Sequence, residues 1–78
     1  MEEIYKGHNI TASAWQVTDT HEWQPKLMVI WNEAGKEYIK YPNFGRFFPA
    51  SREAQEYALA FAKRWIDEGK PAFSITRT

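Results

Sequence analysis

Apolar residues recur every three or four positions between Ser51 and Glu68, the longest regular pattern in the chain. This spacing places side chains on one face of an α-helix. We therefore predict one amphipathic helix over residues 51–68, with Ser51 as its N-cap and with Gly69 and Pro71 as its end. Its apolar face is expected to hold Ala54, Tyr57, Ala58, Phe61 and Trp65.

Strand-like alternation appears before the helix in three stretches, residues 4–17, 23–31 and 36–41. Lys6-Gly7 is expected to mark a bulge or bend in the first of them. The connections between the stretches are short and polar, which predicts a three-stranded antiparallel meander. With one long C-terminal helix packed on one face, the expected fold class is α+β, and residues 1–78 are expected to form a single domain.

A short alternating segment, Phe73–Arg77, follows the helix. It is expected to form either a short fourth strand at the sheet edge or an ordered tail. The side chains predicted to build the core are Ile10, Ala12, Leu27, Val29, Trp31, Ile39, Tyr57, Phe61 and Trp65.

The second strand is apolar on both of its faces. Alternation places Leu27, Val29 and Trp31 on one face, and Met28 and Ile30 on the other. A single helix covers one face of a small sheet. The second face therefore needs another cover: the N-terminal segment, the C-terminal tail or a protein partner. Homodimerisation is one simple solution, because a second copy would bury Met28 and Ile30.

Three phenylalanines lie in the proline-bounded connection before the helix, residues 42–49. They are expected either to plug the open end of the core or to form an exposed contact patch. Under the second interpretation, Phe44 and Phe47 join Met28 and Ile30 in a candidate partner interface.

The net charge and the composition of the chain limit the functions that it can have. Ten Lys and Arg residues balance ten Asp and Glu residues, and cysteine is absent, so disulfides and thiolate metal sites are excluded. Zero net charge argues against strong non-specific binding of nucleic acid. The chain shows neither a signal peptide nor a long apolar run, so we expect a cytoplasmic protein without membrane association.

Catalytic and metal-binding patterns are missing from the sequence. His8 and His21 stand alone, without the spacing of a metal site, and we expect both to be solvated. No nucleophile motif or phosphate-binding glycine loop appears. We therefore expect a protein that is not an enzyme and that uses no cofactor and no metal.

Nucleic-acid binding remains the alternative function. Between residues 36 and 52 aromatic side chains interleave with basic ones, a combination that binds single strands by phosphate contact and base stacking. The other interpretation is that these aromatics face the core and the cations are solvated. The candidate contacts are Lys36, Lys40, Arg46 and Arg52.

Two segments resemble known bacterial proteins. Tyr5-Lys6-Gly7, followed by Ile10, is similar to the opening of many short uncharacterised bacterial proteins. The segments 48–54 and 65–69 resemble the end of the small HlyU-type proteins of proteobacteria. The resemblance implies a strand meander before one long helix, and a role in transcriptional activation. Pro49 and the aromatic-rich approach to the helix depart from that pattern, and no functional residue carries over. We expect a small interaction or regulatory module.

Overall fold

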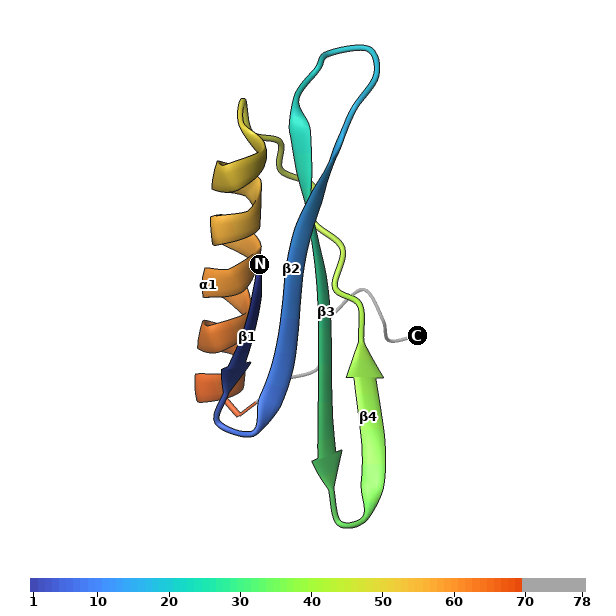
Figure 1. The fold of residues 1–78 in the computed structure, drawn as a ribbon, viewed down its shortest axis with the longest axis vertical. Helices are drawn as coiled ribbons and strands as arrows, with labels where there is room; N and C mark the ends of the chain where they lie inside the picture. Colours follow the sequence, from blue (N-terminus) through green and yellow to red (C-terminus); the bar gives the residue numbers. More distant parts are fainter. Residues whose placement is uncertain (70–78) are drawn as a thin grey trace.

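A computed structural model of the chain describes residues 1–69 and contains one antiparallel sheet and one helix (Figure 1). The sheet order is the chain order, β1-β2-β3-β4, which confirms the predicted α+β class and the antiparallel meander, with four strands before the helix where three were predicted. The segment Phe73–Arg77 lies outside the described residues. The elements are β1 (Glu2–Tyr5), β2 (His8–Gln16), β3 (Trp23–Glu33), β4 (Lys36–Lys40) and α1 (Ser51–Asp67).

The first predicted strand is in fact a hairpin of two strands. Tyr5 pairs with His8, so Lys6 and Gly7 form a two-residue turn instead of a bulge or bend. Both turn residues have positive φ, 48° and 79°, as the favoured two-residue hairpin turn requires. The sequence reading missed this turn because lysine is an unusual residue at its first position, where asparagine is the common choice.

The β3–β4 turn has the same form. Glu33 pairs with Lys36, and the two residues between them, Ala34 and Gly35, have φ of 54° and 78°. Glycine adopts this conformation without strain, whereas the Cβ of alanine costs roughly 1–2 kcal/mol in the left-handed region.

We therefore expect Ala34→Asn to stabilise the protein by about 0.5–1 kcal/mol, since asparagine tolerates positive φ. Thermal unfolding should shift upward by roughly 2–8 °C for a chain of this size. The matched control is Ala60→Asn at an exposed position of α1, where the lower helix propensity of asparagine predicts a small loss of stability. An unfolding temperature unchanged or lowered by Ala34→Asn would contradict the strain at this turn.

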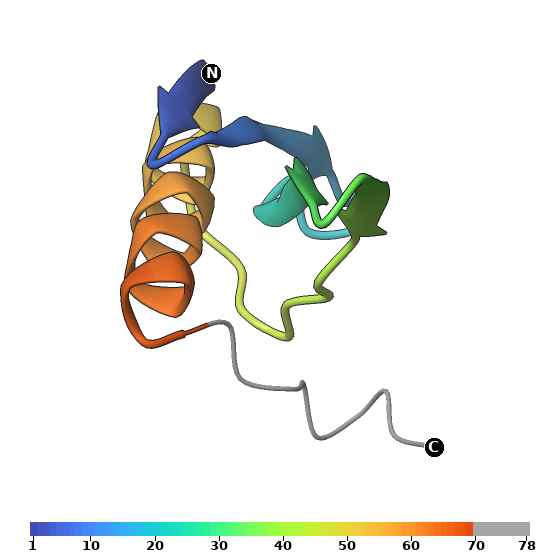
Figure 2. The same cartoon turned by 90° about the horizontal axis from the view of Figure 1, so that it is seen from below.

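The core lies between α1 and one face of the sheet (Figure 2). Three helix alanines have no exposed surface, and they bring the helix backbone close to the strands. At the end of the helix, the Trp65 ring meets Trp31 edge-on, with centroids 5.7 Å apart. The buried members of this core are Ile10, Ala12, Leu27, Val29, Trp31, Phe44, Ala58, Ala62, Trp65 and Ile66, with Tyr57 and Phe61 partly buried against them.

The helix begins as predicted but without the predicted cap. Ala50 is the N-cap residue, with extended backbone and no side-chain hydrogen bond to the helix. Ser51 is already helical, and its hydroxyl accepts a hydrogen bond from the Gln55 side chain at 2.9 Å. At the other end, Gly69 follows the helix with φ of 86°, which confirms the predicted stop.

The chain between β4 and α1 passes to the helix side of the sheet (Figures 1 and 2). This course buries Phe44, which is 8% exposed and meets the rings of Tyr57 and Phe61 edge-on at 5.4 and 5.0 Å. Phe44 therefore plugs the core instead of joining an interface. Phe47 is 45% exposed, and Phe48 is partly buried.

Ile39 was predicted to lie in the core, and this prediction is wrong. Its cross-strand partner is Ile30, on the face that points away from the helix. Ile39 is 43% exposed there. Tyr38 takes the inward place and stacks on the Trp31 ring, with centroids 5.4 Å apart.

Candidate functional site

The face of the sheet opposite α1 carries a row of isoleucines. The pairing register aligns Ile4 with Asn9, Asn9 with Ile30, and Ile30 with Ile39, so these four residues cross all the strands in one line. Directly opposed side chains in a sheet lie within contact range. We call this line of three isoleucines, with Asn9 between Ile4 and Ile30, the apolar row, and the sheet surface opposite α1 the open face.

Two of the three isoleucines in the apolar row are exposed to water. Ile4 is 75% exposed and Ile39 is 43% exposed, while Ile30 and neighbouring Met28 are half-buried. An antiparallel sheet that faces water on one side normally alternates apolar residues inward with polar residues outward. The isoleucines break that alternation on three of the four strands, and burial in the described chain does not explain them.

Polar residues bound the apolar row along the strand direction. On one side, Asn32 pairs with Glu37. On the other side, beyond Met28, Ser13 pairs with Lys26. The open face therefore has an apolar centre and polar margins, the arrangement found in protein interfaces.

One exposed tryptophan on the open face already has partners within the chain. The indole N–H of Trp15 donates to the Gln24 side chain at 2.7 Å. The ammonium of Lys26 lies over the Trp15 ring, 5.6 Å from its centroid. Trp15 thus belongs to the polar margin and is not part of the apolar row.

Of the sequence-predicted interface residues, Met28 and Ile30 lie together on the open face, and Phe44 is buried in the core. The sequence reading missed Ile4 and Ile39. Ile4 lay in a stretch predicted as one continuous strand, so its pairing with Asn9 was not visible. Register was the missing information, because a shift of one residue moves a side chain to the other face.

The four candidate nucleic-acid contacts lie on β4, on the connection after it and on α1. Lys36 and Lys40 are at the two ends of β4. The Arg46 guanidinium lies over the rings of Phe48 and Tyr57 at 5.4 and 5.2 Å. Arg52, on α1, pairs with Glu56 at 3.2 Å. Of the aromatic rings in this stretch, Tyr38 stacks on Trp31 and Phe44 packs on Tyr57, while Tyr41 and Phe47 are 66% and 45% exposed. Nucleic-acid binding stays a prediction.

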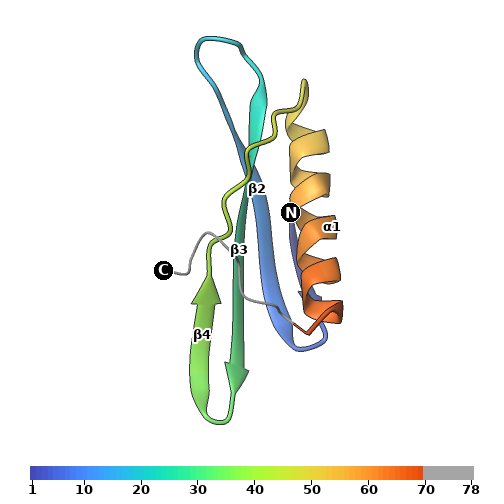
Figure 3. The same cartoon turned by 180° about the vertical axis from the view of Figure 1, so that it is seen from behind.

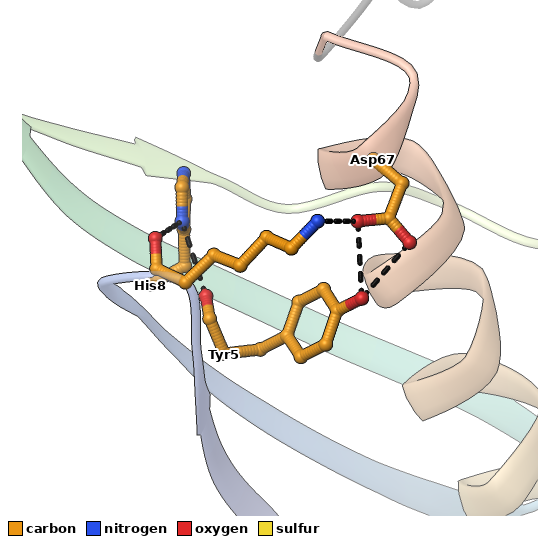
Figure 4. A network of polar contacts seen from close by, with 4 residues as sticks. Tyr5, His8 and Asp67 are labelled. Atoms are coloured by element: carbon orange, nitrogen blue, oxygen red, sulfur yellow. Dashed lines mark hydrogen bonds and ion pairs between the residues drawn. The ribbon is translucent and has the colours of Figure 1, made fainter.

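A polar cluster joins the β1–β2 turn to the end of α1 (Figure 4). The Tyr5 hydroxyl lies 3.0 and 2.9 Å from the two Asp67 carboxylate oxygens, and the Lys6 ammonium is 2.6 Å from one of them. The hydrogen bonds from Lys6 and then Tyr5 lower the pKa of Asp67. The same contact with Asp67 raises the pKa of Tyr5 and of Lys6.

His8 is part of this turn, and the prediction that it is solvated is wrong. His8 is 8% exposed, and the centroid of its ring lies 5.3 Å from that of the Trp31 ring. Nδ1 lies 2.8 Å from the Lys6 carbonyl and 3.2 Å from that of Tyr5. Carbonyl oxygens only accept hydrogen bonds, so Nδ1 carries a proton. His8 holds the turn in shape.

This cluster predicts a pH-dependent contribution to stability. A carboxylate with a lowered pKa stabilises the fold above its ordinary value of 3.8, and the contribution is lost as pH falls through the lower folded value. We expect Asp67→Asn to reduce the free energy of unfolding, measured in urea at neutral pH. The difference in this free energy between the variant and the unsubstituted protein should shrink as the pH falls below 3.8. Asp19→Asn, in the exposed β2–β3 loop, is the control. A difference that stays constant down to strongly acidic pH would contradict the role of Asp67.

Neither a metal site nor a membrane-spanning helix is found in residues 1–69. No three His, Asp or Glu side chains in this part of the chain are grouped so that they could hold a metal ion. The helix α1 is too short and too polar to cross a membrane. Comparison of the chain with protein-family models, with curated protein sequences and with solved structures finds no match.

Proposed function

We propose that this protein is a small, non-enzymatic interaction module that self-associates through the open face of its sheet. The observation that carries the proposal is the apolar row, which places Ile4, Ile30 and Ile39 in one line on the face that α1 does not cover. Burying an exposed isoleucine contributes roughly 1.5–3 kcal/mol. A second copy buries the three isoleucines of each chain at once.

The geometry of the row suits a twofold axis. An axis that runs along the row places each isoleucine against its counterpart in the other copy, which is how a symmetric dimer uses one patch twice. Two sheets pack face to face about 10 Å apart, with interdigitating side chains. The row itself carries no charged residue, so its burial removes no ion from water.

The charge of the chain also suits self-association. Its positive and negative residues balance at ten each, so two copies do not repel each other through net charge. The polar margins of the open face supply hydrogen-bonding groups around the apolar centre, as interface rims do.

A dilution series of 15N-labelled protein tests whether the open face is the interface. The backbone amide resonances are recorded by NMR at each protein concentration. Amides of the apolar row and of Met28 are expected to shift with concentration, while amides on the outer surface of α1 stay constant. Resonances that do not change with concentration, or that change on α1 instead, would refute the proposed face.

A further inference from the structure

One edge of β3 lacks a neighbouring strand over part of its length. β4 pairs with β3 only as far as Val29 and Lys40. In a continued register, residue 42 would face Leu27, but Pro42 has no backbone N–H to donate. After β4 the chain leaves the β3 edge and runs to the start of α1, as Figures 2 and 3 show. The ladder therefore ends at Val29, two residues before Leu27.

The backbone groups of Leu27 point into this gap. Its cross-strand partner, Ala12, uses both of its own groups toward Met1, at 2.7 Å each. Ala12 and Leu27 thus form a pair without mutual hydrogen bonds, which directs the N–H and C=O of Leu27 away from β2. Trp23 has the same orientation and exchanges two bonds with Phe48. For Leu27, no such bond forms within residues 1–69.

A groove of about 390 Å³ lies beside these groups. Its volume is within the range of ligand sites in proteins, roughly 300–1,000 Å³. Its lining combines hydroxyl, amide and apolar side chains, and among residues 1–69 Lys26 is the only charged residue that lines it. The lining residues come from β2, β3 and the segment after β4: Thr11, Ser13, Gln24, Pro25, Lys26, Leu27, Met28, Tyr41, Pro42, Asn43 and Phe44.

We propose that this groove binds an extended acidic peptide segment, which adds to the β3 edge as a short strand. One peptide residue exchanges two backbone hydrogen bonds with Leu27, the recognition mode in which main-chain bonds give affinity. The next peptide residue lies opposite Lys26. Its side chain points to the same face as the Lys26 ammonium, so a carboxylate there is favoured.

The test uses the peptide acetyl-Thr-Val-Glu-Val-Thr-amide, titrated into 15N-labelled protein. We expect the amide resonances of Leu27 and Lys26 to shift together. A peptide with both valines N-methylated lacks the N–H groups that pair with β3, and should bind at least tenfold more weakly. A peptide with lysine in place of glutamate should also bind several-fold more weakly. Equal affinity for the N-methylated peptide, or no shift at Leu27, would overturn the proposal.

Two variants sharpen this experiment. Pro42→Ala supplies the missing N–H for Leu27, so the ladder can close and peptide binding should be lost. Ile30→Glu, which disrupts the proposed dimer, should bind the peptide at least as tightly as the unsubstituted protein, because Met28 belongs to both the groove and the open face and the dimer would compete with the peptide. If the Leu27 amide is protected from hydrogen exchange in peptide-free protein, residues 70–78 or a second copy already occupy the edge, and the proposal is wrong.

Discussion

Replacement of Ile30 by glutamate is expected to weaken self-association at least a hundredfold and to leave a folded monomer. Ile30 lies at the centre of the apolar row, between Asn9 and Ile39. In the proposed dimer, a carboxylate at this position is removed from water without a partner, which costs several kcal/mol. A hundredfold change corresponds to about 2.7 kcal/mol, so this penalty is sufficient. Sedimentation equilibrium measures the change directly.

The matched control for this prediction is Ala60→Glu, which adds the same charge at an exposed position of α1. It should leave the dissociation constant within a factor of about two, because the outer helix surface takes no part in the proposed interface. Ile30→Glu itself should keep the amide spectrum of a folded protein, since Ile30 is only half-buried within one chain. A variant that dimerises as well as the unsubstituted protein would show that the open face is not the interface.

Replacement of Ile10 by alanine is expected to destabilise the fold by about 2–5 kcal/mol. Ile10 is 1% exposed and packs between β2 and α1, so truncation loses buried apolar area and leaves a cavity. A domain of this size has roughly 5–15 kcal/mol of stability in total, so the loss is large. Urea unfolding at protein concentrations below the dimer dissociation constant measures it.

Ile39 supplies the matched comparison, because the same substitution is made in the same sheet. Ile39→Ala is expected to cost less than about 1 kcal/mol in the monomer, since this side chain is already partly in water. At concentrations that favour the dimer, Ile39→Ala should instead weaken association. Equal losses of monomer stability for Ile10→Ala and Ile39→Ala would contradict the assignment of Ile39 to the open face.

Periodicity sufficed to predict the helix and the antiparallel meander, because both follow from the spacing of apolar residues over many positions. It also placed Leu27, Val29 and Trp31 on the helix side of β3, which the core confirms. The hairpin turn at Lys6-Gly7 was not recognised, because lysine is uncommon at the first turn position, where φ is positive. The Lys6 ammonium pairs with Asp67, at the far end of the chain, a contact that no local pattern reveals.

The candidate site was predicted only in part. The two apolar faces of β3 pointed to a surface at Met28 and Ile30, and the structure places both on the open face. The places of the other residues in the apolar row depend on the registers of three strand pairs. The alternation of apolar and polar residues does not fix these registers to within one residue, and a shift of one residue moves a side chain to the other face. Phe44 illustrates the same limit, since only the path of the chain after β4 distinguishes a buried ring from an exposed one.

The most direct test of the proposed face-to-face dimer is the solution mass of the unsubstituted protein, measured by light scattering over a wide range of concentrations. We expect the mass to rise from 9.2 kDa at the lowest concentrations toward twice that value at the highest, and to remain there. A mass that stays at 9.2 kDa throughout would contradict self-association through the open face. A mass that grows without limit would contradict the closed twofold arrangement.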